Sequence, residues 1–261
     1  MTASPSSPEK AFAALVDVMR RLRDPATGCP WDLEQDFRSI APYTLEEAYE
    51  VADAIQRNDM NDLRDELGDL LLQVVFHGQM ADEAGHFTTA DVANAITNKM
   101  IERHPHVFEK ADGRSSDGQT EAWEAMKAAE RAAKAKTGEA ASALDGVALA
   151  LPALLRALKL QKRAARVGFD WSEPQPIFDK LAEEIAEVHE ALDSQDLDAI
   201  EDEIGDLLFV GANLARAAGV DPEAALRRSN DKFERRFKSM EALARSRGQD
   251  FASLDLPAQD A

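Results

Sequence analysis

Two stretches of this chain carry the same five acidic residues at the same spacing. The first set is Glu46, Glu47, Glu50, Glu66 and Asp69, and the second is Glu183, Glu184, Glu187, Glu203 and Asp206. All five positions shift together by 137 residues, and fifteen residues separate the two parts of each set. A solvated acidic face would not need to keep that register, whereas a site of converging carboxylates would. The sequence therefore predicts an internal duplication of one structural unit.

The spacing within each set places the acids on one face of a helix. Glu47 and Glu50 are three residues apart, as are Glu66 and Asp69, and such pairs lie side by side on a helix. Two antiparallel helices would bring both acidic faces together, and the like charges would repel each other without a cation. An all-oxygen set suits Mg²⁺, with Mn²⁺ also possible, better than zinc. The alternative is an ordinary solvated helix face, since 49 of the 261 residues are Asp or Glu.

Composition narrows the classes of partner and compartment. The net charge of −19 argues against nonspecific binding to nucleic acid or to an anionic membrane. Cys29 is the single cysteine, so no disulfide can form within the chain and the cytoplasm is the expected compartment. No apolar run approaches the ~20 residues that a membrane span needs, and the polar N-terminus does not resemble a signal peptide.

Helical periodicity is nearly continuous, and Val and Ile alternate too rarely to support a sheet. Thr44 and Glu47 form a capping-box pattern, which predicts that the first acidic helix begins at Tyr43–Thr44. We expect an all-α protein with an N-terminal repeat (1–136), a linker (137–150) and a C-terminal repeat (151–261). The expected helices span residues 9–23, 43–57, 61–84, 89–103, 121–136, 176–192, 197–218 and 222–245, with one more starting near Pro152.

Both acidic sets fit the pattern E-E-x-x-E, a spacer and E-x-x-D, and further strings accompany them. These are G-C-P-W-D at 28–32, R-H-P-H-V-F at 103–108, G-F-D-W at 168–171 and K-F-E-R-R-F at 232–237. With these strings the chain resembles the MazG family of nucleoside triphosphate pyrophosphohydrolases in its full-length, two-repeat form. The resemblance spans about residues 9 to 245.

The resemblance implies a fold, an activity and a division of labour. The fold would be all-α, with tandem helical repeats that assemble into a helix-bundle homodimer. The activity would be Mg²⁺-dependent hydrolysis of NTP or dNTP to the monophosphate and pyrophosphate, in clearing aberrant or surplus nucleotides. The C-terminal repeat would be catalytic, and the N-terminal repeat structural or regulatory.

The candidate residues of the C-terminal repeat fall into three roles. The metal ligands are Glu184, Glu187, Glu203 and Asp206. Glu183 could orient or deprotonate the attacking water, or act as a further ligand, and the sequence leaves both open. Phosphate contacts are expected from Lys232 and Arg236, which lie one turn apart. Lys180 could also reach phosphate, or could be an exposed ion-pair partner of Glu184. Glu183 and Asp206 are the other predicted substrate-binding residues.

The N-terminal repeat carries a second possible metal site and different surroundings. Its acids are Glu46, Glu47, Glu50, Glu66 and Asp69, followed by the basic pair Lys99 and Arg103. Family members usually hold a tryptophan near the C-terminus against the nucleotide. The first repeat keeps Trp123, but the second has none beyond Trp171, so we expect weakened nucleotide affinity.

Two other interpretations of the acidic residues, a di-iron site and a non-catalytic module, agree with the sequence to different degrees. A di-iron site would need Glu-x-x-His motifs, and Glu187-Val188-His189 has the wrong spacing. A non-catalytic helical module for dimerisation or regulation, with vestigial acids, stays open as the alternative function.

Overall fold

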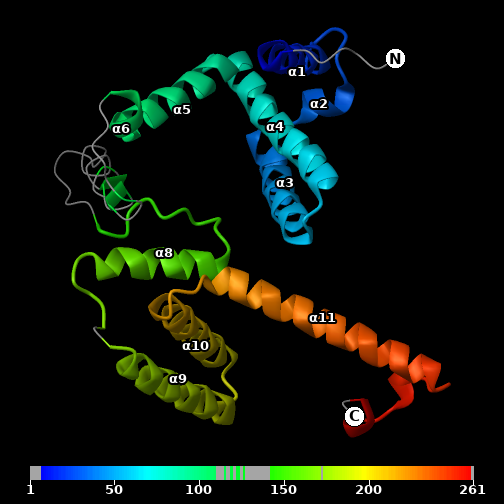
Figure 1. Ribbon diagram of the computed structural model, residues 1–261, viewed down its shortest axis with the longest axis vertical. Coiled ribbons are helices and arrows are strands. Elements are labelled where there is room, and N and C mark those ends of the chain that lie inside the picture. The colour runs from blue at the N-terminus through cyan, green and yellow to red at the C-terminus, as the bar shows by residue number, and fades with distance from the viewer. Residues whose placement is uncertain are drawn as a thin grey trace. The chain divides into compact units, whose positions relative to one another are not determined.

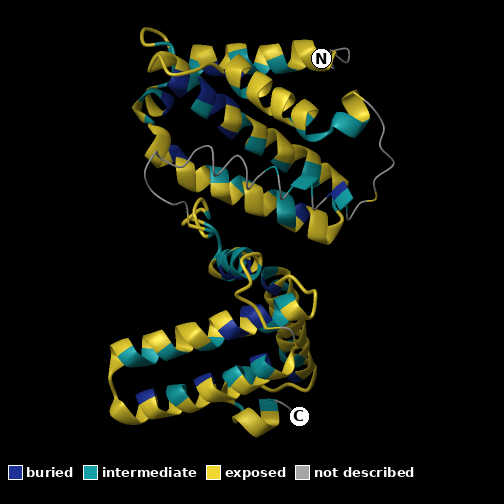
Figure 2. Cartoon of the chain, turned by 90° about the vertical axis from the view of Figure 1, so that its left-hand side faces the viewer, coloured by how far each residue is buried: buried dark blue, intermediate teal, exposed yellow. Residues whose placement is uncertain are grey.

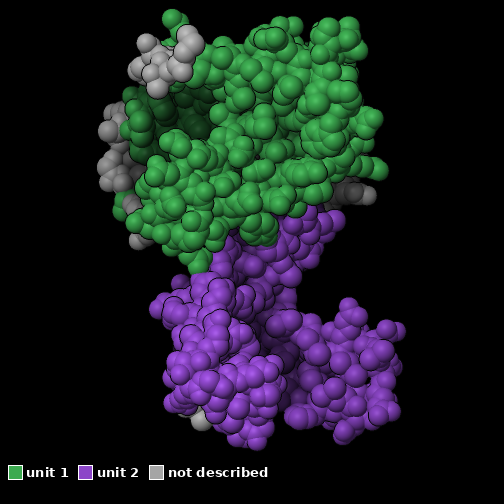
Figure 3. All heavy atoms as spheres, turned by 90° about the vertical axis from the view of Figure 1, so that its right-hand side faces the viewer, with its two compact units in different colours: residues 1–123 green, residues 124–261 purple. Residues whose placement is uncertain are grey.

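The computed structural model describes residues 7–109, 115, 118–119, 122–123, 126, 142–171 and 173–259. Every regular element among these residues is a helix (Figure 1), which confirms the all-α prediction. The chain divides into two compact units, residues 1–123 and 124–261 (Figure 3). The repeat boundaries and the linker near residues 137–150 stay predictions, and the helix expected over 121–136 lies largely outside the described residues.

Unit 1 is a series of helices built around one long antiparallel hairpin. The hairpin consists of α3 and α4, which are the two acidic helices of the first repeat. The helices are α1 (Pro8–Leu22), α2 (Pro30–Glu34), α3 (Phe37–Arg57), α4 (Met60–Glu83), α5 (Thr89–Arg103) and α6 (Pro105–Phe108).

The prediction that the first acidic helix begins at Tyr43–Thr44 is wrong. Helix α3 begins at Phe37, two turns earlier, because Asp36 accepts the backbone N–H groups of Arg38 and Ser39 at 2.8 Å. The Ser39 hydroxyl in turn accepts the Asp36 N–H, so a true capping box stands there. Pro42 lies inside the helix, past its first turn, where a proline cannot donate the usual backbone hydrogen bond to the residue four positions earlier.

The turn inside each acidic hairpin repeats at the same register. Asn58 ends α3 in the left-handed conformation at φ 56°, and the side chain of Asp59 then caps α4. In unit 2, Gln195 takes φ 59° and Asp196 caps the next helix. In both units the chain reverses at one residue with left-handed backbone conformation, followed by an N-cap residue. The two hairpins therefore carry their acids at matching positions.

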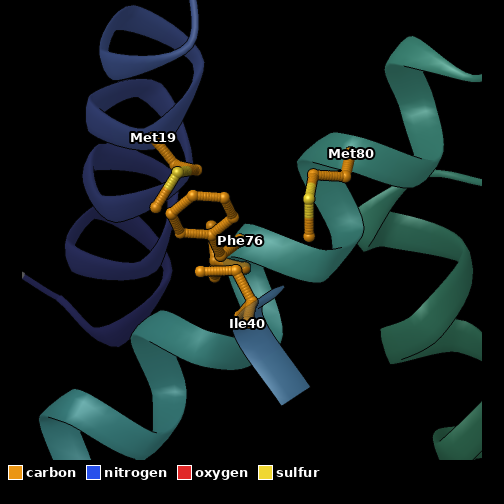
Figure 4. Close-up of a cluster of buried hydrophobic side chains, with 5 residues drawn as sticks. Met19, Ile40, Phe76 and Met80 are labelled. Atoms are coloured by element: carbon orange, nitrogen blue, oxygen red, sulfur yellow. The ribbon is translucent and has the colours of Figure 1, made fainter. Parts of the chain in front are cut away.

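The core of unit 1 forms where α1 crosses the end of α4. Met19 of α1, Ile40 of α3, and Phe76 and Met80 of α4 point toward one another (Figure 4), and Val75 completes the buried cluster. The partly buried Phe12, Leu15, Val16, Leu22 and Leu72 pack around it. Burial of this kind stabilises by about 25 cal/mol per Å² of apolar surface, and it holds α1 against the acidic hairpin.

Unit 2 repeats the hairpin with a helix before it and a long helix after it. Helices α9 and α10 carry the second acidic set, α8 packs against α10, and α11 packs against both α8 and α10. The elements are α8 (Ala153–Ala165), α9 (Gln175–Ser194), α10 (Leu197–Ala217), α11 (Pro222–Ser246), a 3₁₀ turn at Phe251–Ser253 and α12 (Leu256–Gln259).

Many large apolar side chains of the hairpin helices face solvent in the single chain. Exposed positions dominate the long helices in Figure 2. They include Leu67, Leu71 and Val74 in unit 1, and Ile204, Leu208 and Phe209 in unit 2. Contiguous exposed apolar surface of this kind marks sites of association.

Candidate functional site: two carboxylate clusters

The α9–α10 hairpin brings three carboxylates of the second acidic set together. One carboxylate oxygen each of Glu184, Glu187 and Glu203 lies within 4.8 Å of the other two. Glu184 and Glu187 stand on one face of α9, and Glu203 faces them from α10. Asp206, the fourth predicted ligand, lies exposed outside this cluster.

Glu184 is the most deeply placed acid of the site. Only 3% of the surface of Glu184 is exposed to solvent. One carboxylate oxygen pairs with Lys180 Nζ at 2.8 Å, whereas Oε2 is buried and has no hydrogen-bond partner in the described part of the chain. A buried carboxylate oxygen without a donor is costly, and a cation beside it would remove that cost.

Lys180 neutralises part of the second cluster from within. Its ammonium lies 2.8 Å from Glu184, 2.9 Å from Glu183 and 3.9 Å from Glu187. The hydrogen bond to Glu184, followed by the one to Glu183, raises the pKa of Lys180. The residue at the matching position of unit 1 is Tyr43, so the two sites differ in their internal charge.

The electrostatics around Glu187 show how crowded the second cluster is. Burial raises the pKa of the Glu187 carboxyl, and repulsion from Glu184, Glu203 and Glu183 acts in the same direction. The charge of Lys180 lowers it, but does not offset the other causes. The site therefore holds more negative charge than its own lysine can balance.

Unit 1 also brings three carboxylates together, but with a different membership. Oxygens of Glu47, Glu66 and Asp69 lie within 4.8 Å of one another. Asp69 belongs to the group although its counterpart Asp206 does not, and Glu50 is left out although its counterpart Glu187 belongs. Glu46 lies exposed on α3.

The pKa shifts of unit 1 have the same physical origin as those of unit 2. Burial raises the pKa of Glu47, with repulsion from Asp69, Glu50 and Glu46 adding to it. Burial also raises the pKa of Glu66, followed by repulsion from Glu50 and other acids.

Sequence reasoning missed the glutamine that supports this cluster. Gln73 is buried on α4, and a side-chain hydrogen bond from it opposes the rise in the pKa of Glu47. Its position four residues after Asp69, on the same helix face, was the available signal. The matching residue of unit 2 is Val210, so this support belongs to the first site alone.

The predicted basic pair of unit 2 does not join the acids in the described part of the chain. Lys232 and Arg236 lie exposed on α11, and in Figure 1 α11 runs on beyond α8 and away from α9. Among the described residues no ion pair links either side chain to the α9–α10 acids. In unit 1, Lys99 is exposed on α5.

Trp123, the proposed nucleotide-facing residue of unit 1, is engaged elsewhere. Its Nε1 donates to the carbonyl oxygen of Arg103 at 3.0 Å, and its ring meets His104 edge-on at 5.2 Å between centroids. The Arg103 carbonyl also accepts from Gln119 Nε2. Trp123 therefore packs against the C-terminal end of α5.

The donor set of the second cluster fits a hard divalent cation. All three converging groups are carboxylates, and the buried Oε2 of Glu184 has no donor among the described residues. Burial, with repulsion from the neighbouring acids, raises the pKa of Glu187. Mg²⁺ and Mn²⁺ prefer such oxygen ligands, whereas zinc favours nitrogen and sulfur.

None of the helices in the described part of the chain has both the length and the apolar character needed to cross a membrane.

A family model described as the MazG nucleotide pyrophosphohydrolase domain matches residues 35–108 and 172–240, which include both acidic hairpins.

Curated relatives extend the similarity over nearly the whole chain. The nucleoside triphosphate pyrophosphohydrolase of Escherichia coli K12 is 52% identical over 244 residues, which are 93% of this chain and 91% of that protein. The nucleoside triphosphate pyrophosphohydrolase/pyrophosphatase MazG of Thermotoga maritima is 44% identical over 237 residues, covering 91% and 88%. The pyrophosphohydrolase of Mycobacterium tuberculosis is 40% identical over 156 residues, covering 59% and 46%. Two acidic hairpins in one register, each matched by the family model, place this chain in the MazG nucleotide pyrophosphohydrolase family.

Proposed function

We propose that this chain is a nucleoside triphosphate pyrophosphohydrolase that converts an NTP or dNTP and water into the monophosphate and pyrophosphate. The observation that carries the proposal is the cluster of Glu184, Glu187 and Glu203, with its buried and unpartnered carboxylate oxygen. The named activity of relatives that match nine-tenths of the chain supports it. Clearing aberrant or surplus nucleotides from the cell is the corresponding role.

The second repeat is the proposed catalytic repeat. Glu184, Glu187 and Glu203 would hold Mg²⁺, with Mn²⁺ as a substitute, and Asp206 would complete the set by turning its exposed carboxylate inward. The first cluster has Tyr43 where the second has Lys180, so at this position it has no ammonium group that could pass from carboxylate to phosphate. We assign the first repeat a structural or regulatory role.

The reaction requires the α–β bond of the triphosphate to break as water adds to phosphorus. A bound Mg²⁺ would neutralise phosphate charge and lower the pKa of a water molecule. Glu183 stands at the edge of the cluster and is exposed, so it can orient that water or accept its proton. Lys180 Nζ can leave Glu183 and donate to a phosphate oxygen, because its side chain is one-third exposed.

Lys232 and Arg236 remain proposed phosphate contacts. Helix α11 packs against α8 and α10, and the two side chains lie exposed on it. Their contribution therefore depends on a movement of α11 or on a second copy of the chain.

A homodimer is proposed on the exposed apolar side chains of the acidic hairpins. Leu67, Leu71 and Ile204 are among those that a partner would cover, and obligate interfaces are rich in such residues. Sedimentation velocity at micromolar concentration should give a dimer, and a stable monomer would contradict the proposal. The cytoplasm is the proposed compartment, on the single cysteine.

A product assay over a nucleotide panel tests the activity. Purified protein is incubated with each of the common NTPs and dNTPs, with and without Mg²⁺, and the products are separated by ion-exchange chromatography. We expect monophosphate and pyrophosphate in equal amounts, and only with metal present. Diphosphate and orthophosphate would refute the reaction type, and no turnover of any nucleotide would favour the alternative of a non-catalytic dimerisation or regulatory module.

A further inference from the structure

A cavity of about 660 Å³ that opens to solvent lies in unit 2, beside α8, the loop that follows it, and α10. Its lining is mainly apolar and includes Leu160, Gln161, Ala164, Trp171, Phe209 and Asn213. None of these residues takes part in the metal or phosphate chemistry proposed above.

Unit 1 fills the corresponding position with large side chains, and two backbone hydrogen bonds establish which residues correspond. After Gly28, the N–H of Cys29 donates to Leu22 O at 2.8 Å; after Gly168, the N–H of Phe169 donates to Ala164 O at 3.1 Å. Leu22 therefore corresponds to Ala164. One turn earlier on each helix, Met19 of unit 1 corresponds to Gln161 of unit 2.

The register of the acidic hairpins extends the correspondence to the other wall. At a shift of 137 residues Phe76 corresponds to Asn213, and Met80 to Ala217. Met19, Phe76 and Met80 interlock in the core of unit 1 (Figure 4). Unit 2 has two amides and an alanine in their place, so its cavity exists because core-filling side chains are absent and polar ones stand there instead.

The two amides are held in place by neighbouring groups. Gln161 is 7% exposed, and its Nε2 donates to Phe209 O at 2.8 Å. Its Oε1 is buried, and no residue in the described ranges donates to it. Asn213 is also buried, and its Oδ1 accepts from Arg216 Nε at 2.9 Å. An apolar core does not retain an unused buried acceptor without cost, which points to a ligand with a donor at its edge.

We propose that this cavity binds the nucleobase of the substrate, with Gln161 and Asn213 contacting the base edge. The inference rests on the proposed function and adds the determinant of base preference to it. Trp171 and Phe209 offer aromatic surface against which a flat heterocycle can pack. Arg216 is paired with Asp170, so the cavity has no unbalanced cation to attract phosphate.

The position of the cavity relative to the acids suits a nucleotide. Asn213 follows Asp206 by seven residues on α10, so both lie on the same face at a separation of roughly 10 Å along the axis. A nucleoside spans a comparable distance between its base and its 5′-phosphate. A triphosphate at the carboxylate cluster can therefore place its base in the cavity.

Binding of isolated nucleosides tests the cavity without any turnover. Adenosine, guanosine, cytidine and uridine are each added to metal-free protein, and contact is detected by saturation-transfer NMR. We expect at least one nucleoside to bind the wild-type protein. The variant Gln161→Met with Asn213→Phe restores the side chains of unit 1 and should weaken that binding by about tenfold or more.

A matched control and a fold check accompany this test. Gln249→Met changes an exposed glutamine away from the cavity and should bind nucleosides as the wild type does, and thermal melting reports whether each variant is folded. Absence of nucleoside binding to the wild type, or equal binding by a folded double variant, would overturn the proposal.

A second variant separates base recognition from a structural role. Asn213→Asp keeps the shape and the acceptor for Arg216 but replaces the amide NH₂ donor by an oxygen. We expect the ratios of kcat/KM among the four bases to change by about tenfold. An equal loss for every base, or unchanged ratios with normal hydrolysis, would reject the cavity and leave the proposed function standing. If the protein hydrolyses no nucleotide, the proposed function fails while the nucleoside experiment still decides the cavity.

Discussion

Paired substitutions in the two acidic helices decide which repeat is catalytic. The variant Glu184→Gln with Glu187→Gln removes two charges from the second cluster, and Glu47→Gln with Glu50→Gln removes the matching charges 137 residues earlier. Loss of one group that stabilises transition-state charge costs about 10²–10³-fold in rate. We therefore expect kcat/KM to fall by about 10³-fold or more in the first variant, and to keep most of its value in the second.

The structure indicates that this loss would not come from unfolding. The Glu184→Gln side chain keeps an oxygen that can accept from Lys180, which lies 2.8 Å from the present carboxylate. Because the Lys180 side chain is one-third exposed, solvent screens much of the ion-pair energy that the substitution removes. Removing the repulsion that raises the pKa of Glu187 acts in the opposite direction. The two effects oppose each other, so the melting temperature should stay within a few degrees of the wild-type value.

The assay measures pyrophosphate release at several Mg²⁺ concentrations, with Mn²⁺ binding followed by calorimetry on the same samples. The α9 variant should lose both turnover and high-affinity metal binding, while its melting temperature stays near that of the wild type. Full activity in the α9 variant together with loss in the α3 variant would refute the assignment and move the active site to residues 46–103.

Three further predictions follow from the described contacts. Gly78→Ala should lower the free energy of unfolding, measured in urea, by about 1–3 kcal/mol, because the new Cβ would lie 2.4 Å from Thr89 Oγ1. As a control, the new Cβ of Gly68→Ala in the same helix would meet no described atom within 4 Å, so this variant should have an unchanged or higher free energy of unfolding. Burial lowers the pKa of His77, so the unfolded chain binds the proton more readily and stability should fall as the pH drops through about 6.5; a His77→Gln variant that keeps the same pH dependence would contradict this. Arg23→Met should lower the free energy of unfolding by about 2–4 kcal/mol, because the nearly buried guanidinium of Arg23 pairs with Glu83 at 2.7 Å. An unchanged urea midpoint would show that this ion pair contributes little to stability.

Most helices could be predicted because their signals are local. The expected span 61–84 is observed as Met60–Glu83, and the expected 197–218 as Leu197–Ala217. The start of α3 differs from the predicted one because two capping patterns compete in that stretch. Asp36 with Ser39 forms the box that is used, whereas Thr44 bonds to His77 and to the Ile40 carbonyl instead.

The candidate site could be predicted only in part. Spacing places five acids on the facing sides of each hairpin, but it does not say which three carboxylates converge. The selection of Asp69 in one unit and Glu187 in the other depends on side-chain rotamers and on neighbours. Lys180 is visible in the sequence as a possible partner of Glu184, yet only the structure shows it bridging Glu183 and Glu184.

The duplication is visible in the amino-acid sequence because the acidic pattern repeats at a constant shift. The helices and their acidic faces can be predicted because helix geometry relates residues three or four positions apart. Which core positions are filled by side chains and which leave a cavity depends instead on tertiary packing. Met19 meets Phe76 across two helices that are far apart in the chain, and Gln161 lies beside Phe209 in the same way. Contacts between distant segments depend on how the helices pack, and no local pattern encodes them.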